Sequence, residues 1–291
     1  MRFAPIPFLL LALPALAQIE GVVDVHVHCA PDSMPRSIDA LETARMARRH
    51  GMRALLFKNH YTHTASLAYL VKQEVPGIEV YGGIALNRSV GGVNPAALEH
   101  MARTTGRLGR VVWMPTFDSE HYHKTNQPNP NHVAVSRGGA LLPEVIEVLK
   151  IAARENLSLA TGHSSPAESL LLIREAKALG VERIVVTHPL PPLVGMSVEQ
   201  QKQAAAMGAY LEYPSNEVMP SGALKLADYA KAIRAVGPEH CILSSDLGQA
   251  MNPVHTDGWI RYLQMFREAG FNQAEIDRMA KVNPARFLGL E

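Results

Sequence analysis

The chain has little of several features that mark other classes of protein. Its 28 basic and 27 acidic residues nearly cancel, so the formal net charge is only +1, and no run of like charges occurs. This balance argues against nucleic-acid and membrane-surface binding, which both need a basic patch. With two cysteines, the chain cannot rest on a framework of several disulfides. Beyond residue 17, no apolar run has the about 20 residues that a membrane-spanning helix needs.

The N-terminus carries the one notable apolar stretch. Arg2 precedes a run from Ala4 to Leu16 that is interrupted by three prolines and followed by Ala17. An early positive charge, a short apolar stretch and a small-x-small exit are typical of a secretory signal peptide. We therefore expect a signal peptide at 1–17 and one domain at 18–291. The mature protein would be exported, periplasmic or secreted, without membrane contact.

Eight apolar segments alternate with helix-like segments at intervals of roughly 30 residues, as in repeated β-α units. The predicted strands are Val22–His28, Arg53–Lys58, Glu79–Ala85, Arg110–Thr116, Leu157–Gly162, Arg183–His188, Ala209–Tyr213 and Cys241–Asp246. The predicted helices include Ile38–His50, Pro143–Glu155, Pro166–Leu179, Val198–Met207 and Leu226–Val236. This alternation predicts an α/β fold, either a (β/α)₈ TIM barrel or an open doubly wound sheet.

Chemistry at the strand ends favours the barrel. Polar side chains that can bind a metal follow the first, second, fifth, sixth and eighth predicted strands. Only a closed barrel brings all of those ends around one mouth. In that arrangement Cys29 and Cys241 lie at opposite ends of the barrel, beyond the about 7 Å limit for a disulfide. We therefore expect two free thiols.

The connection after the fourth predicted strand is unusually long. It runs from Phe117 to Gly139 in a polar sequence rich in asparagine, proline and histidine, with no helix predicted inside it. Long connections without secondary structure are often lids or binding loops. We expect a substrate-covering loop, with a merely mobile insertion as the alternative.

Histidines occupy the strand ends in a regular order. In the first strand, His26 and His28 are two residues apart and so lie on one face, roughly 6–7 Å apart along the strand, where both can bind one cation. His163 ends the fifth strand, His188 the sixth and Asp246 the eighth. Each of the three precedes a turn signal. A capping or core role explains any one of them, but not the whole order.

Several segments match a known pattern. They are His26–Asp32 (HVHCAPD), Phe57–His60 (FKNH), Gly82–Asn87 (GGIALN), Trp113–Thr116 (WMPT), Ala160–His163 (ATGH), Val186–Pro189 (VTHP), Ser245–Gln249 (SDLGQ) and Asn283–Gly289 (NPARFLG). With these segments the chain resembles the amidohydrolase superfamily of metal-dependent hydrolases and, within it, an uncharacterised amidohydrolase-like family. The resemblance extends over essentially all of 18–291.

The resemblance implies a ligand set. His26, His28 and Asp246 would bind the more buried metal, and His163 and His188 would bind a second metal or orient substrate. Asp246 would also accept a proton from the water that attacks the substrate. Zinc suits these ligands best, as one or two ions, and manganese, iron or cobalt would also fit.

Lys58 marks a departure from that pattern. Two-metal members usually bridge their ions with a carboxylated lysine or a glutamate from the fourth strand, which here ends at Thr116 without a lysine. Lys58, at the end of the second strand, is the alternative. It would be a carboxylated bridging ligand, an electrophilic or substrate-binding group, or an outward-facing lysine. Other polar residues at strand ends or the rim are candidates for substrate contacts: His60, Asn87, Thr116, Asp118, Glu212 and His255.

These features predict an enzyme, a metal-dependent hydrolase that acts on an ester, lactone, amide or phosphoester bond of a small molecule. A metal-dependent decarboxylase or isomerase on the same barrel is the second hypothesis. A non-catalytic exported protein that binds a metal or ligand is the third. A homo-oligomer is compatible with all three.

Overall fold

The structure is a computed structural model, and it describes residues 18–126, 128–220 and 222–290. Eight parallel strands form one sheet in the order β1-β2-β3-β4-β7-β8-β9-β10. Their bounds are β1 Val23–Val27, β2 Ala54–Phe57, β3 Glu79–Ala85, β4 Gly109–Trp113, β7 Ser158–Ala160, β8 Ile184–Val186, β9 Tyr210–Pro214 and β10 Cys241–Ser244. All eight predicted strands are confirmed. Most are shorter than predicted, because their polar last residues leave the sheet to form the barrel mouth.

The sheet closes between its first and last strands. The Asp246 amide donates to the His26 carbonyl, and the His28 amide donates to the Leu247 carbonyl, both at 2.8 Å. Val27 and Leu247 form a parallel bridge at the same place. These contacts join β1 to β10, so the predicted TIM barrel is confirmed and the open doubly wound sheet is wrong.

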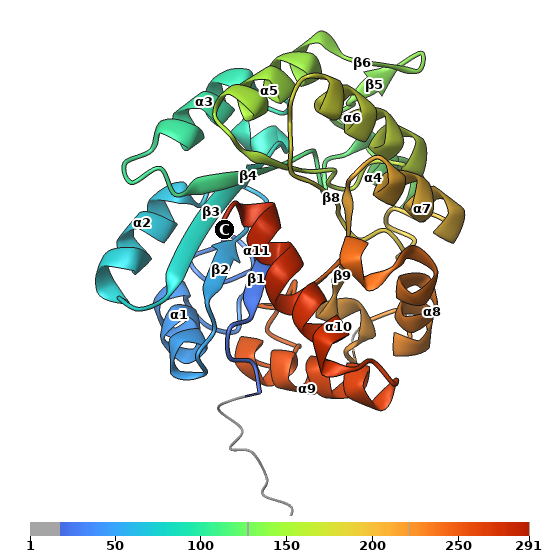
Figure 1. Cartoon of the computed structure of the whole chain (residues 1–291). Helices are drawn as coiled ribbons and strands as arrows, with labels where there is room; N and C mark the ends of the chain where they lie inside the picture. The colour runs from blue at the N-terminus through green and yellow to red at the C-terminus, as the bar shows by residue number, and fades with distance from the viewer. Residues whose placement is uncertain (1–17, 127, 221, 291) are drawn as a thin grey trace, which may run out of the picture.

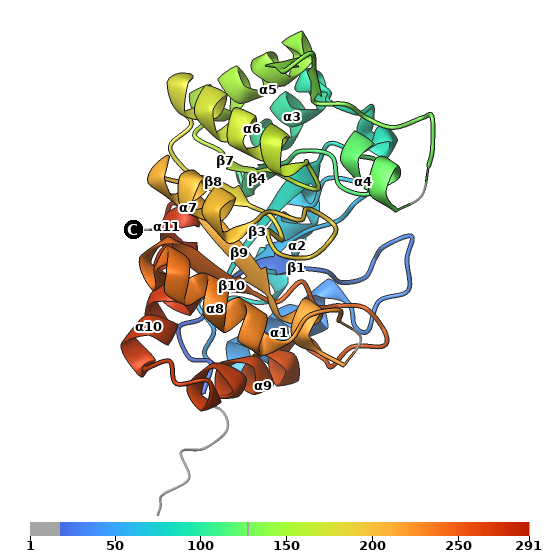
Figure 2. The same ribbon diagram turned by 90° about the vertical axis from the view of Figure 1, so that its right-hand side faces the viewer.

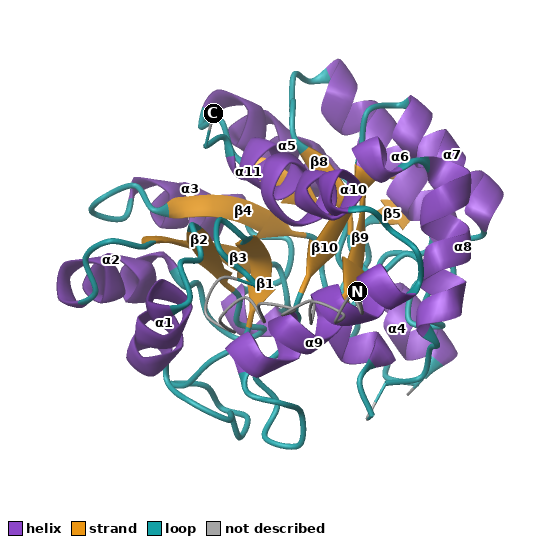
Figure 3. Cartoon of the chain, turned by 60° about the horizontal axis from the view of Figure 1, so that its bottom comes forward, coloured by secondary structure: helices purple, strands orange, loops and turns teal. Residues whose placement is uncertain are grey.

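The helices lie around the outside of the strands, except that α11 lies across one end of the barrel (Figures 1 and 3). They are α1 Ala40–Arg49, α2 Ala65–Glu74, α3 Pro95–Arg103, α4 Glu120–Thr125, α5 Pro143–Arg154, α6 Pro166–Ala178, α7 Val198–Ala206, α8 Leu226–Val236, α9 His255–Glu268, α10 Gln273–Asp277 and α11 Asn283–Leu288. Their starts follow local chemistry. Ser165, two residues after His163, accepts from the Glu168 amide in a capping box that begins α6, and Pro166 takes the first helical position.

The long connection after β4 is more ordered than the sequence predicts. It contains α4 and a two-stranded hairpin of β5 (Ser136–Arg137) and β6 (Ala140–Leu141). The Ser119 hydroxyl caps α4 by accepting from the Tyr122 amide, and it lies 2.8 Å from the His163 carbonyl. A polar helix of six residues has no apolar periodicity, so the sequence gives no pattern by which to predict it. The expectation of a loop without helix is therefore wrong.

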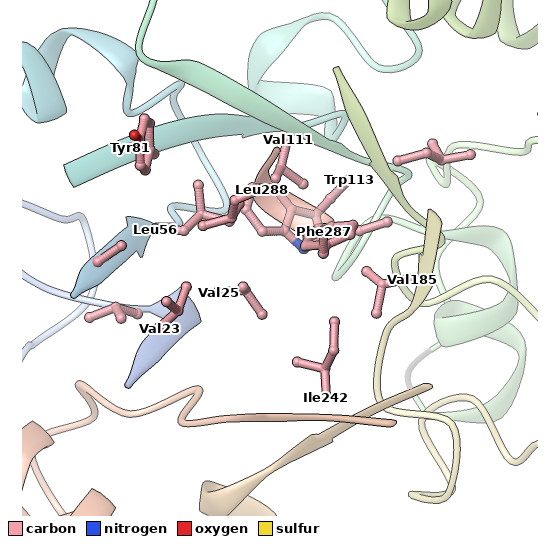
Figure 4. Packing of buried hydrophobic residues seen from close by; sticks show 14 of the residues in the cluster. Val23, Val25, Leu56, Tyr81, Val111, Trp113, Val185, Ile242, Phe287 and Leu288 are labelled. Carbon is pink, nitrogen blue, oxygen red and sulfur yellow. The ribbon is translucent and has the colours of Figure 1, made fainter. Parts of the chain in front are cut away.

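The C-terminal helix α11 covers the N-terminal end of the barrel. Ser158, at the start of β7, donates to the Phe287 carbonyl, and Arg53, just before β2, donates to the Leu290 carbonyl. Phe287 and Leu288 are buried in the main apolar cluster, together with Val25 and Trp113 (Figure 4). Figure 2 shows α4 and the connection after β1 on the opposite side from α11. The barrel is thus filled at one end and carries its loops at the other.

Other sequence predictions have mixed outcomes. Cys29 and Cys241 are both free and buried, as expected, and burial raises the pKa of each thiol. No helix in the described residues is long and apolar enough to cross a membrane. The predicted signal peptide at 1–17 lies outside the described residues, so it stays a prediction.

Replacing Phe287 with alanine is expected to lower the free energy of unfolding by about 3–5 kcal/mol, because the side chain is almost fully buried at the closed end of the barrel. The control is Val282→Ala, at an exposed position just before α11, which should cost less than about 0.5 kcal/mol. Urea denaturation of both variants measures the difference. Equal losses would contradict this account of α11.

Candidate metal centre

Three strand ends bring the predicted ligands together at the loop-bearing end of the barrel. Asp246 Oδ1 lies 3.0 Å from His26 Nε2 and 3.0 Å from His28 Nε2. Asp246 Oδ2 lies 3.4 Å from His188 Nε2. His26 and His28 belong to β1 and the residue after it, His188 follows β8 and Asp246 follows β10. The carboxylate therefore stands at the centre of three imidazoles.

The backbone is strained at two of these residues. His188 has φ 47° and Asp246 has φ 48°, in the left-handed region that non-glycine residues avoid. Each such residue costs about 1–2 kcal/mol, and this strain tends to occur at functional sites. Both residues are the points at which a strand ends and the chain turns, and both side chains line one cavity. The strain is therefore connected with directing these two side chains into the site.

The donor set fits a divalent cation. His26, His28 and Asp246 form, within the described residues, a group whose ligand atoms all lie within 4.8 Å of one another. Ligands at about 2.1 Å from a tetrahedral zinc ion lie about 3.4 Å apart, close to the 3.0 Å found here. Deprotonated Nε2 and carboxylate atoms repel at this distance unless a proton or a cation lies between them. The residues are thus suited to Zn²⁺ or a similar ion.

Glu212 fixes the orientation of the His26 ring by accepting a hydrogen bond from it. Its Oε1 accepts from His26 Nδ1 at 2.8 Å and from the Ser244 hydroxyl at 2.7 Å, in a buried position. A proton kept on Nδ1 leaves Nε2 as the free ligand atom, the usual role of a carboxylate behind a metal-bound histidine. Because β9 continues to Pro214, Glu212 lies below the mouth, and its contact with substrate stays a prediction.

The charges around these side chains and their burial shift their pKa values towards protonation states that suit a cation. Burial opposes ionisation of Asp246, but the charge of His26 and hydrogen bonds from His26 and His28 outweigh it, so the pKa of Asp246 lies well below its usual value. Burial lowers the pKa of His28 and of His188 to about 4. Near neutral pH, therefore, a carboxylate faces two neutral imidazoles.

Lys58 points into the same site. Its Nζ lies 2.8 Å from His26 Nε2 and 5.5 Å from the centre of the Trp113 ring. Burial lowers the pKa of Lys58 to about 8, against the attraction of Asp246 and Glu212. The side chain is almost fully buried, so an outward-facing lysine is wrong. The carboxylated ligand and the electrophilic or substrate-binding group both remain compatible with this position.

His163 lies beside the group rather than within it. Its ring centre is 5.8 Å from that of His188, and its Nδ1 has no hydrogen-bond partner among the described residues. Burial, with the charge of Lys58, keeps the pKa of His163 far below the usual range, so the ring is neutral. It is placed to help hold a second ion or to contact substrate, the two roles that the resemblance implies.

A cavity of about 160 Å³ opens over these residues. Its walls are formed by His28, Met34, Arg36, Lys58, His60, Phe117, His163, His188, Leu193, Asn216, Glu217, Asp246 and Gln249. A larger, mostly apolar groove between α6 and α7 contains none of the predicted ligands. The site is therefore small, polar at its base and apolar along part of its wall.

Three residues of the site, Arg36, Asn216 and Glu217, were missed from the sequence. Asn216 donates to Asp246 Oδ2 at 2.8 Å. Glu217 has its Oε1 3.9 Å from His188 Nδ1, and burial with the charge of Asp246 raises the pKa of Glu217 to about 7. Arg36 forms an ion pair with Asp32 at 2.6 Å, and its Nη2 lies 3.2 Å from His28 Nδ1. Asn216 and Glu217 follow the true end of β9, which the predicted strand stopped short of.

Most of the residues predicted to contact substrate bond to other residues of the chain and do not line the cavity, so their contact with substrate stays a prediction. Asn87 and Thr116 bond to each other and to His60, and Asp118 accepts from the Arg88 amide at 2.9 Å. His255 lies on α9, where its Nε2 is 2.8 Å from Asp24 Oδ2. None of Asn87, Thr116, Asp118, Glu212 and His255 lines the cavity, whereas His60 does. Position at a strand end identifies the mouth but not the direction of a side chain.

Cation binding by the metal-free protein is expected to strengthen as the pH rises. Burial tends to lower the pKa of His26, but the charges of Asp246 and Glu212 outweigh it and raise this pKa to about 9. A cation must displace that proton, so affinity should rise by up to about tenfold per pH unit below 9 and then level off. Competition of Zn²⁺ with a chelator across this range measures it. A flat or falling profile would contradict the assignment.

The substitution Glu212→Gln is expected to weaken Zn²⁺ binding by about 10–100-fold, because the charge behind His26 is lost while the side-chain shape is kept. The same substitution at the exposed Glu199 on α7 provides the control. Chelator competition measures both affinities. If both variants bind as the unmodified protein does, Glu212 has no part in holding the cation.

Comparison with known proteins agrees with this architecture. The organophosphorus hydrolase from Deinococcus radiodurans is 16% identical, with a TM-score of 0.61 and coverage of 94% of each chain. An amidohydrolase from Pseudomonas aeruginosa is 13% identical, with a TM-score of 0.62 and coverage of 94% of this chain and 97% of that one. A mutant PTE-like lactonase from Deinococcus radiodurans is 16% identical, with a TM-score of 0.60 and the same two coverages.

These similarities confirm the barrel fold. A search of curated protein sequences gives no match. The sequence model described as "Family of unknown function (DUF6282)" matches residues 21–212, more than half of the chain. The protein belongs to this family.

Proposed function

We propose that this protein is a metal-dependent hydrolase that uses water to cleave an ester, lactone, amide or phosphoester bond in a small molecule. The observation that carries the proposal is the meeting of His26, His28, His188 and Asp246 from three separate strand ends beside one open cavity. Two of these residues hold a strained backbone to reach the site.

A divalent cation held by His26, His28 and Asp246 would supply Lewis-acid chemistry, polarising the scissile group and lowering the pKa of water towards about 7. The chain's own residues supply the rest. Asp246 is ionised and faces the cavity, so it can accept a proton, and Asn216 holds its Oδ2 in place. Glu217, with a pKa of about 7, can hold a proton or give one up near neutral pH.

The cavity favours a small substrate. Its volume of about 160 Å³ is below the about 300–1,000 Å³ of typical ligand pockets. Phe117, Leu193 and Met34 form apolar wall, and Arg36 and Lys58 bring positive charge to the polar side. A compact molecule with a hydrolysable group at one end and an apolar part at the other matches this lining.

The metal is proposed to be zinc, since neutral imidazoles and a carboxylate suit it, with manganese, iron or cobalt as alternatives. Whether Lys58 is carboxylated would determine how many ions the site holds. Its Nζ lies beside His26 Nε2, and burial lowers its pKa to about 8, which increases the uncharged fraction that can react with carbon dioxide. A carboxylated Lys58 would bridge a second ion towards His163 and His188, whereas an unmodified one would bind substrate.

The test combines elemental analysis with hydrolysis assays. The zinc-loaded protein is tested on p-nitrophenyl acetate, a δ-lactone and diethyl p-nitrophenyl phosphate. We expect bound metal and turnover of at least one of them, and a fall of about 10²–10⁴-fold in kcat/KM for Asp246→Asn. Asp257→Asn is the control, because that carboxylate is exposed on α9 and lies outside the cavity. A fall from two ions to one in Lys58→Ala would identify a bridging ligand.

Absence of metal after reconstitution, or unchanged turnover in Asp246→Asn, would overturn the proposed hydrolase. Incorporation of solvent oxygen into the product distinguishes hydrolysis from decarboxylation or isomerisation on the same barrel.

A further inference from the structure

Three buried polar residues form a chain of hydrogen bonds that ends at the cavity. Asn87 follows β3, Thr116 follows β4 and His60 follows β2. Asn87 Nδ2 lies 2.6 Å from Thr116 Oγ1, and Thr116 Oγ1 lies 2.9 Å from His60 Nδ1. Of the three, His60 alone lines the cavity. The direction of each hydrogen bond in this chain can be assigned from its surroundings.

The orientation of the Asn87 amide is set by the backbone. Its Oδ1 accepts from the amides of Thr116 at 2.8 Å and Asp118 at 3.3 Å. Only the carbonyl oxygen can accept these bonds, so Nδ2 is the atom directed at Thr116 Oγ1 and at the His60 carbonyl, 2.9 Å away. Asn87 therefore donates to the Thr116 hydroxyl.

The Thr116 hydroxyl must in turn donate its own hydrogen bond to an acceptor. The residue is fully buried, and apart from the donating Asn87 amide the partner of its hydroxyl in the described residues is His60 Nδ1. If His60 donated from Nδ1, the hydroxyl proton would lack an acceptor, which costs about 1–3 kcal/mol in a buried site. Thr116 therefore donates to Nδ1. A neutral His60 then carries its single N–H on Nε2.

The His60 ring is held rigidly in this state. It stacks on His28 with ring centres 4.9 Å apart and an interplanar angle of 20°, and it packs against Phe117 at 4.2 Å. No hydrogen bond to Nε2 occurs within the described parts of the chain, and this nitrogen is the ring nitrogen that does not contact Thr116. The donor is thus aligned in advance and available to a ligand.

We propose that His60 binds substrate by donating from Nε2 to the carbonyl or phosphoryl oxygen on which negative charge develops, and that Thr116 and Asn87 fix the tautomer that makes this possible. The proposal rests on the proposed hydrolase function and specifies its substrate class as one with such an oxygen. A neutral donor held in place before the reaction strengthens as charge grows on the oxygen, and it needs no proton transfer. Thr116 and Asn87 act through His60 and are positioning residues.

The tautomer can be measured directly. Nitrogen-15 NMR of the histidine side chains in the zinc-loaded protein, with His60→Gln used for assignment, should show His60 with hydrogen on Nε2 alone. Titration with inorganic phosphate, whose oxygens can accept this bond, should shift the His60 signal to saturation. Hydrogen on Nδ1, or a signal that phosphate does not move, would overturn the proposal.

Variants separate the donor from a structural role. Glutamine can place an amide N–H where His60 Nε2 lies, so His60→Gln should keep kcat/KM within about tenfold, whereas His60→Met should lose about 10²–10³-fold. Thr116→Val should lose up to about tenfold, and Thr116→Ser, which keeps the hydroxyl, should lose less. Metal content is measured in every variant and should not change.

These experiments distinguish a failure of the proposal for His60 from a failure of the proposed hydrolase function. Turnover that His60→Met leaves unchanged would overturn the role of His60 and leave the hydrolase intact. The expected tautomer and phosphate shift, with no turnover of any of the three substrates, would support the donor and overturn the hydrolase.

Discussion

The seam between β1 and β10 is the constraint on which the rest of the site depends. One carboxylate, Asp24, lies at this seam and accepts four hydrogen bonds. Its Oδ1 accepts from the amides of His26 and Ser245, and its Oδ2 from His255 and Trp259 on α9. Asp24 thus joins the strand that carries two ligands to the one that ends in Asp246. A register irregularity in β1 between Asp24 and Val27 accompanies this arrangement.

The joining of β1 to β10 by itself brings most of the donor group together. When β1 and β10 are joined, His26 and Asp246 come together because the Asp246 amide bonds to the His26 carbonyl. The left-handed turn at Asp246 then brings the carboxylate to two imidazoles of the neighbouring strand. Glu212 from β9 and Lys58 from β2 approach His26 from either side. Residues of three nearby strands, β2, β9 and β10, thus act on one imidazole of β1.

Much of this was predictable from the sequence, and the limit has a physical cause. The positions of His26, His28, His188 and Asp246 follow from strand periodicity and from the rule that parallel strands end at one face. That rule gives the height of a residue along the barrel only roughly and does not give the direction of its side chain. Glu212 was therefore placed among the substrate contacts although it lies below His26, and His255 although it faces Asp24. Arg36 lies in an irregular connection and Glu217 in the short 3₁₀ helix Ser215–Val218, and the sequence shows no period for either.

The closed N-terminal end of the barrel also determines the route by which molecules would reach and leave the site. Within the described residues, α11 and the apolar cluster fill the N-terminal end of the barrel, opposite the cavity above His26. If the proposed hydrolase function holds, substrate would enter and product would leave past the same rim of loops. A product that keeps the group recognised in the cavity would then block the next substrate molecule until it diffuses away. Turnover would be sensitive to product concentration, and the residues of the rim would influence release as well as recognition.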